Sequence, residues 1–423
     1  MVNVVDCIMG GGKTQAAIRY INDHPEKKFL VITPYLDETE RFRSNCPAAK
    51  FWTPSNHIQE FSFKKSIHFA HLVEEERNIA TTHSLFALLS DEVVADIAAR
   101  GYTVFIDEVV DILGKVTTNE TDMDVIVDSG RLIEDNDVCT DEYFIYKENE
   151  EKKYDGGYYS EIFDVVRSRR LVYEKKGDKR GRAIMWTLQR ELFTLSDEVY
   201  VLTYLFHSSQ MQAFLKIHSI PYQIIGVVKD VDGNYLFSDT RIAPDYVRDI
   251  PNKIHICDNR KLNAVGENRL ALSANWVREA AYLENGAKLE PLRKSLQNWM
   301  RNYHPNVPAN QRLWTTFKAG RRALSGGGYT KRFLPFNCRA TNAYRNCRVL
   351  AYCANVFFDP VFSRYYKSQG VELDADAYAL STMIQWIWRS AIRDGKEIWI
   401  YVPSRRMREL LEGWLNKLSK GEM

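Results

Sequence analysis

The sequence has no long uninterrupted apolar run, and no segment reaches the roughly eighteen apolar residues that a membrane-spanning helix requires. Its seven cysteines are scattered without a Cys-x-x-Cys pair, so neither a disulfide framework nor a zinc site is predicted. Its charges nearly cancel, with 57 Lys and Arg against 55 Asp and Glu, so any nucleic-acid contact must come from local patches. The amino terminus lacks the basic-then-apolar layout of a secretory signal. We therefore expect a cytoplasmic protein without a membrane partner.

What the chain does have is enough length for two domains. Its composition, 45% hydrophobic and 26% charged residues, is typical of a globular protein. Its 423 residues are too many for a single domain of ordinary size. Through the first third, short apolar runs alternate with helix-like stretches, a pattern that predicts a parallel sheet covered by helices on both faces. Weaker strand and helix signals recur later, beginning with the apolar run at 222–228. The sequence therefore predicts an α/β fold with a first domain over 1–206 and a second over 207–423.

A polar segment at 116–190 interrupts this alternation. Acidic and then basic stretches replace the apolar runs, for example at 117–124, 147–157 and 173–182. Such charge runs are typical of solvated loops, although a contact with nucleic acid or with a partner protein would also suit them. We interpret the segment as an insertion or accessory segment late in the first domain, after which an apolar strand at 199–203 resumes the sheet.

Residues 7–14 read Cys-Ile-Met-Gly-Gly-Gly-Lys-Thr and fit a phosphate-binding loop, with a cysteine in place of the first glycine. Consecutive glycines allow backbone N–H groups to turn inward around phosphate oxygens, and the following helix directs its positive end at them. The alternative is a glycine-rich turn that merely opens a helix, but the preceding strand and the Lys-Thr pair favour binding of ATP and magnesium. The residues that this loop would supply are Gly10, Gly11, Gly12, Lys13 and Thr14.

A second motif is the apolar strand at 104–106, which ends in the two carboxylates of Asp107 and Glu108. In a nucleotide hydrolase, this arrangement lets the first acid hold the metal ion while the second polarises the attacking water. An Asp-Glu pair alone usually just starts a surface loop. Because a phosphate loop precedes it, we interpret Asp107 as a magnesium ligand and Glu108 as a catalytic residue.

In their order along the chain, these segments resemble the successive motifs of superfamily 2 helicases, the DEAD/DEAH-like ATPases. The segments of the first half are Gly10-Gly-Gly-Lys-Thr14, Thr33-Pro34, Ala80-Thr-Thr-His83 and Asp107-Glu108-Val109. Thr203-Tyr204 resembles the motif that closes the first lobe. The segments of the second lobe, similar to the later motifs, are Trp314-Thr-Thr-Phe317, Arg339-Ala-Thr-Asn342 and Gln385-Trp-Ile-Trp-Arg389. The resemblance covers nearly the whole chain. It implies two tandem RecA-like domains, each a mostly parallel sheet flanked by helices, with ATP hydrolysed in the cleft between them.

The last of these segments resembles the helicase motif Q-x-x-G-R-x-x-R, which implies catalytic roles for Gln385 and for an arginine finger. Trp388 replaces the glycine of that motif, and Ile392 occupies the position of its final arginine, with Arg393 one residue later. We favour Arg389 as the arginine that neutralises charge on the transferred phosphoryl group, with Arg393 as the alternative. The Asp-Glu-Val-Val sequence also departs from the RNA-dedicated box subfamilies, which favours DNA over RNA.

The resemblance further implies contacts with a nucleic-acid backbone. Hydroxyl and imidazole groups at strand ends can bond phosphate without reading bases, although each could equally be an ordinary strand-end or helix-cap residue. A locally basic stretch with interleaved aromatic residues, 321–348, would suit a single strand as well as a plain solvated surface. The residues that we expect at the backbone are Thr33, Thr82, His83, Thr316 and Thr341.

Together, the motifs imply an ATP-dependent nucleic-acid motor, a DNA helicase or translocase acting on single-stranded or forked DNA. The compact size resembles helicase-like replication or recombination proteins of bacteriophages, which would place the protein in the host cytoplasm beside replication or recombination partners. Two alternatives remain open: a phosphate-loop ATPase switch, and a protein–DNA remodelling factor that does not separate strands.

Overall fold

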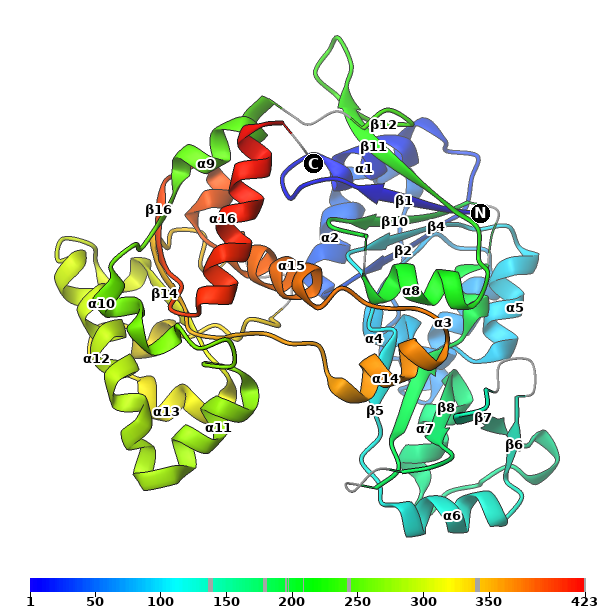
Figure 1. Cartoon of the computed structure of the whole chain (residues 1–423). Coiled ribbons are helices and arrows are strands. Elements are labelled where there is room, and N and C mark those ends of the chain that lie inside the picture. The colour runs from blue at the N-terminus through cyan, green and yellow to red at the C-terminus, as the bar shows by residue number, and fades with distance from the viewer. Residues whose placement is uncertain are drawn as a thin grey trace. The chain divides into compact units, whose positions relative to one another are not determined.

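The computed structural model describes residues 1–135, 140–177, 181–194, 196, 198–207, 209–241, 245–338 and 343–421 (Figure 1). The chain divides into two compact units, each built from several segments. The first consists of Met1–Ile8, Gly12–Arg241 and Asp359–Leu373. The second consists of Met9–Gly11, Ile242–Phe358 and Asp374–Met423.

A seven-stranded sheet forms the centre of the first unit, in the order β12-β11-β1-β10-β4-β2-β3. Its strands are β1 (Val2–Asp6), β2 (Phe29–Thr33), β3 (Ile79–Thr82), β4 (Thr103–Asp107), β10 (Val199–Thr203), β11 (Tyr222–Lys229) and β12 (Tyr235–Ser238). All neighbouring pairs are parallel except β11 with β12. One strand, β10, separates β1 from β4. The loop after β1 and the acids at the end of β4 therefore lie at the same edge of the sheet.

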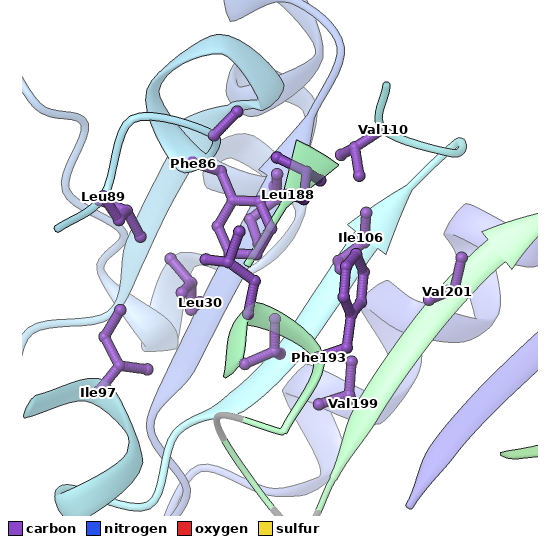
Figure 2. Packing of buried hydrophobic residues seen from close by; sticks show 14 of the residues in the cluster. Leu30, Phe86, Leu89, Ile97, Ile106, Val110, Leu188, Phe193, Val199 and Val201 are labelled. Carbon is purple, nitrogen blue, oxygen red and sulfur yellow. The ribbon is translucent and has the colours of Figure 1, made fainter. Parts of the chain in front are cut away.

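Side chains point alternately to the two faces of the sheet along each strand, and apolar side chains are buried on both faces. Helices cover both faces. Tyr20 of α1 lies 5.7 Å from Phe105 and 5.5 Å from Tyr200, measured between ring centroids, on one face. The other face carries the main apolar core, which α3, α5 and α8 help to form. Figure 2 shows part of that core, with Leu30, Ile106, Val199 and Val201 of the strands beside Phe86, Leu188 and Phe193. The helices are α1 (Lys13–Asp23), α2 (Leu36–Asn45), α3 (Lys65–Glu74), α4 (His83–Phe86), α5 (Asp91–Ala99) and α8 (Gln210–Ile217).

The predicted insertion is a folded subdomain and not a set of solvated loops. It contains a five-stranded antiparallel sheet in the order β5-β9-β8-β7-β6, with helices α6 (Glu120–Asp128) and α7 (Ser160–Ser168). Its apolar residues are scattered among charged residues in the sequence. In the fold they form a separate core that includes Met123, Phe163 and Leu171. The strands are β5 (Leu113–Lys115), β6 (Leu132–Glu134), β7 (Tyr143–Glu148), β8 (Arg169–Glu174) and β9 (Ile184–Leu188).

The first unit also includes two segments that the sequence assigns to the second domain. The apolar run at 222–228 lies in β11, which pairs in parallel with β1, so the sheet continues beyond the expected boundary at 206/207. Helix α14 (Pro360–Ser368) is the other segment. Its Tyr365 packs edge-on against Tyr143 of the insertion at 5.3 Å, and the preceding Asp359 forms a 2.7 Å ion pair with Lys115.

The second unit is built on a four-stranded parallel sheet in the order β13-β16-β15-β14. Its strands are β13 (Ile254–Ile256), β14 (Arg312–Thr315), β15 (Val349–Tyr352) and β16 (Ile398–Tyr401). Its helices are α9 (Ile250–Lys253), α10 (Arg260–Asn263), α11 (Ala274–Tyr282), α12 (Glu290–Asn298), α13 (Arg321–Leu324), α15 (Ala375–Ile387) and α16 (Arg405–Ser419). Buried Trp314, Trp299 and Tyr401 belong to its core.

The two sheets confirm the predicted fold class, an α/β protein of two tandem RecA-like domains with an insertion late in the first. In the part of the chain that the structure describes, no helix has both the length and the apolar character needed to cross a membrane.

Candidate nucleotide-binding site

The glycine-rich loop joins β1 directly to α1 and leaves the start of that helix open to an anion. Gly10 and Gly12 have φ angles of +84° and +89°, a left-handed conformation that favours glycine. Gly12 is also the N-cap residue, so it offers no side chain to the helix, and the first turn of α1 has no acidic residue. The N–H groups at the start of α1 are therefore available to phosphate oxygens.

Lys13 folds back over this loop. Its Nζ donates a 2.6 Å hydrogen bond to the carbonyl of Cys7 and a 3.3 Å bond to the carbonyl of Ile8. Burial lowers the pKa of Lys13, whereas the Cys7 thiol and the carboxyl groups of Asp107, Asp6 and Glu108 act to raise it. The lysine thus lies within electrostatic reach of both predicted acids. The oxygens of a bound phosphate would offer its ammonium group stronger partners than two neutral carbonyls.

Asp107 lies at the carboxyl end of β4 and is only 9% exposed. Burial raises its pKa to about 7, and the charges of Glu38 and Glu108 act in the same direction, against those of Lys13 and Arg41. A carboxyl group near half ionisation at neutral pH is characteristic of functional sites. A divalent cation would favour its ionised form.

Glu108 has a φ of +62°, a left-handed conformation that is uncommon for a residue with a side chain. Its N–H donates a 3.0 Å hydrogen bond to the carbonyl of Leu202 in β10, which holds the backbone in this conformation. Backbone strain of this kind concentrates at active sites and ligand clamps. The bend turns the chain out of the sheet directly after Asp107.

Two of the residues expected at a nucleic-acid backbone instead bond the protein itself. Thr33 is fully buried and donates its hydroxyl to the carbonyl of Tyr35 at 2.9 Å. His83 is also buried, with Nε2 2.8 Å from the carbonyl oxygen of Asp107. Both expectations need correction, because these polar groups bond backbone carbonyls at the end of the sheet and are not exposed to a nucleic-acid backbone. Thr82, the N-cap residue of α4, is half-buried and remains accessible.

The remaining predicted residues belong to the second unit. Gln385 is exposed on α15, and Arg393 is exposed in the short helix at Ala391–Asp394, whereas Arg389 is 8% exposed. Thr316 follows β14 and is only 2% exposed, which contradicts its expected place at a nucleic-acid surface. Thr341 lies outside the described residues.

Three residues at the loop escaped the sequence analysis. Asp6 ends β1 with its side chain buried, and Arg241 forms an ion pair with it at 3.3 Å. Tyr235 of β12 packs directly on Gly12. Asp6 carries a weak sequence signal, a charged residue ending an apolar strand, but Tyr235 and Arg241 come from a distant hairpin that no local motif marks.

The donor set fits magnesium delivered with a nucleotide better than a metal held by protein alone. Among the described residues, no group of three or more His, Cys, Asp or Glu side chains could hold a metal ion. Magnesium at phosphate-transfer sites takes one or two carboxylates, and phosphate oxygens and water supply the rest. Thr14 at the start of α1 and Asp107 at the end of β4 are the residues that would hold it.

The buried state of Asp107 predicts a pH-dependent stability. Between its ordinary pKa of 3.8 and about 7, the folded protein retains a proton that the unfolded chain has lost. The contribution of Asp107 to the free energy of unfolding should therefore fall as pH rises through this window, by up to about 4 kcal/mol, and stay flat above it. Asp107→Asn cannot ionise, so it should stabilise the protein at about pH 8 and change little at about pH 4. Urea unfolding at several pH values measures this.

Asp128→Asn, which changes an exposed acid at the end of α6, is the matched control and should have no such effect. An equal gain from Asp107→Asn at both pH values would contradict the assigned burial of its charge.

Comparisons with known proteins place the chain in a family. Residues 248–415 match the family described as the YonV C-terminal Rossmann-like domain. The whole chain is similar to the SPbeta prophage-derived uncharacterized protein YonV of Bacillus subtilis (strain 168), with 35% identity over 424 residues and 98% of each chain covered.

Among solved structures, one titled "Structure of S. tokodaii Xpd4" aligns with a TM-score of 0.48 and 11% identity, covering 98% of this chain and 94% of that chain. The sequence similarity to YonV extends over essentially the full length of both proteins. The chain therefore belongs to the YonV family.

Proposed function

We propose that this protein is an ATP-dependent nucleic-acid motor, a DNA helicase or translocase of superfamily 2. The observation that carries the proposal is the meeting of Lys13, Asp107 and Glu108 at one edge of the first sheet. Lys13 lies within electrostatic reach of both acids, and it bonds the carbonyls of the loop that a nucleotide would occupy. A cation, a glycine-rich anion site and two acids in this arrangement suit hydrolysis of a nucleoside triphosphate.

Each residue of this group has a distinct task. The N–H groups of Gly10, Gly11 and Gly12 bind phosphate oxygens, and Lys13 leaves the loop carbonyls to neutralise the terminal phosphates. Thr14 and Asp107 would hold magnesium that arrives with the nucleotide, and the ion would supply positive charge to the phosphates. Glu108 orients the attacking water and accepts its proton.

The second unit supplies an arginine in this proposal. Arg389 neutralises charge that develops on the transferred phosphoryl group, and Arg393 is the alternative. Gln385, one helical turn before Arg389, is exposed on α15 and bonds Ser381 of the same helix at 3.3 Å. These assignments rest on the motif that Gln385-Trp-Ile-Trp-Arg389 resembles.

Nucleic-acid binding would rely on exposed cations. Arg321, Arg322, Lys331 and Arg345 are exposed in the second unit, where they suit a phosphate backbone. The aromatic side chains among them are less available to bases, because Tyr329 is buried and the Arg321 guanidinium lies over the Phe333 ring at 4.5 Å. Single-stranded or forked DNA is the proposed substrate. The relative described as prophage-derived supports a phage context, and within it we propose a role in the replication or recombination of DNA.

A second function is a phosphate-loop ATPase switch, or a protein–DNA remodelling factor that does not separate strands. The burial of Thr33, His83 and Thr316 favours it, because three of the side chains expected to grip a strand are turned into the protein. In this case the nucleotide state would control a partner and no strand would be tracked.

Lys13→Ala should abolish ATP turnover, because no other residue of the loop can carry positive charge to the terminal phosphates. Phosphate release from ATP with magnesium measures this. Lys28→Ala is the matched control, because Lys28 is a lysine of the same unit that pairs with Glu76 at 3.1 Å. Equal turnover by Lys13→Ala and the unsubstituted protein would contradict the assignment of the site.

Single-stranded or forked DNA should increase the rate of ATP hydrolysis, because a motor couples its catalytic cycle to its track. The decisive assay compares single-stranded, duplex and forked DNA with matched RNA on one preparation. Stimulation by DNA above RNA supports the motor. Hydrolysis that no nucleic acid changes would exclude the motor and leave the switch.

A further inference from the structure

Asp6 is a buried acid at the start of an anion-binding loop, a position that calls for an explanation. It follows Val2 and Val4 on the face of β1 that packs into the main core, and it is only 6% exposed. Burial raises its pKa, whereas Arg241, a backbone hydrogen bond from Phe206 and the charge of Lys13 act in the opposite direction. Its Oδ1 atom has no hydrogen-bond partner among the described residues. A negative charge here would weaken phosphate binding unless a cation compensates for it.

Arg241 is that cation. Its Nη2 lies 3.3 Å from Oδ2 of Asp6, and its side chain is 35% exposed. A guanidinium has five N–H donors in a planar fork, so one bond to Asp6 leaves most of them for another anion. Arg241 and Lys13 both act to lower the pKa of Asp6 and of the Cys7 thiol, so two cations lie near the first residues of the loop.

The hairpin of β11 and β12 brings Arg241 to this position. Strand β12 packs on the loop so closely that a Cβ atom on Gly12 would lie 2.1 Å from Cδ1 of Tyr235. Two residues later, Phe237 stacks on Tyr200 of the central sheet with ring centroids 5.1 Å apart. Arg241 follows three residues after Ser238, the end of β12. The hairpin is thus held against the loop, and Arg241 is held beside Asp6.

We propose that Arg241 is a second phosphate-binding cation of the nucleotide site and that Asp6 orients it. This inference rests on the proposed function and adds a residue that no helicase-like motif of the chain contains. Asp6 fixes one edge of the guanidinium, and the other edge binds phosphate oxygens beside Lys13. The arrangement explains why an acid lies buried at the loop: it positions the arginine instead of opposing the nucleotide.

The test separates phosphate binding by Arg241 from simple neutralisation of Asp6. The variants are Arg241→Ala, Asp6→Asn and the double variant, and displacement of a fluorescent ATP analogue by ATP and by adenosine gives the affinities. We expect Arg241→Ala to weaken ATP binding by about ten- to a hundredfold, the effect of a lost charged hydrogen bond, and to leave adenosine binding unchanged. The double variant should be equally weak.

Recovery of wild-type ATP affinity by the double variant would overturn the proposal, because Arg241 would then serve only to neutralise Asp6. Unchanged affinity of Arg241→Ala would also overturn it. Because the double variant leaves no unpaired buried charge, it keeps the test valid if Arg241→Ala unfolds. Arg19→Ala is the matched control, since Arg19 pairs with Asp23 at 2.6 Å on α1, and it should bind ATP normally.

Failure of the proposed function gives a different result. If the unsubstituted protein and Lys13→Ala bound ATP equally poorly, the nucleotide site itself would be wrong, and the role of Arg241 would be overturned with it. If the unsubstituted protein bound ATP, Lys13→Ala did not, and Arg241→Ala matched the unsubstituted protein, only the role of Arg241 would fall.

Discussion

The burial of opposite charges at one edge of the first sheet is the constraint on which the site depends. Lys13, Asp107 and Asp6 all lie where burial opposes their charged forms. Such a cluster costs free energy in the absence of a ligand, and the protein meets part of that cost by bonding Lys13 to loop carbonyls. In the function that we propose, a magnesium nucleotide would supply the missing charges. On that proposal, low stability of the empty cluster and tight binding of the nucleotide would be two consequences of the same burial.

The rest of the first unit holds this edge in place. Strand β11 and the hairpin that follows extend the sheet beside β1 and press Tyr235 on Gly12. Helix α14 comes late in the sequence but belongs to the first unit, where it contacts the insertion. Nη2 of its Arg364 lies 3.6 Å from Oε1 of Glu174 in β8. The first unit therefore includes residues 359–373, which follow residues 242–358 of the second unit in the sequence. Substitutions around residues 359–373 should be interpreted as changes to the first unit.

How far the sequence predicts the site depends on how local each signal is. The positions of Lys13 and Asp107 at one edge of the sheet could be predicted, because a glycine loop before a helix and an acid after an apolar strand are recognisable within a few residues, and their roles stay a prediction. Arg241 was not, because only the pairing of β11 with β1 brings it to Asp6. Thr33 and His83 were predicted at a nucleic-acid backbone, but they bond carbonyl groups of the protein. A polar residue at a strand end has the same sequence pattern in both cases. The charge-rich insertion concealed its core for a similar reason, since scattered apolar residues converge only after folding.

The most direct test of the account is an experimental structure of the protein with magnesium and a non-hydrolysable ATP analogue. The account predicts the β- and γ-phosphates against the N–H groups that follow Gly10, with Lys13 moved from the carbonyls of Cys7 and Ile8 onto the phosphates. The metal ion should lie between Thr14 and Asp107. A nucleotide bound elsewhere, with Lys13 still bonded to those two carbonyls, would contradict the central claim.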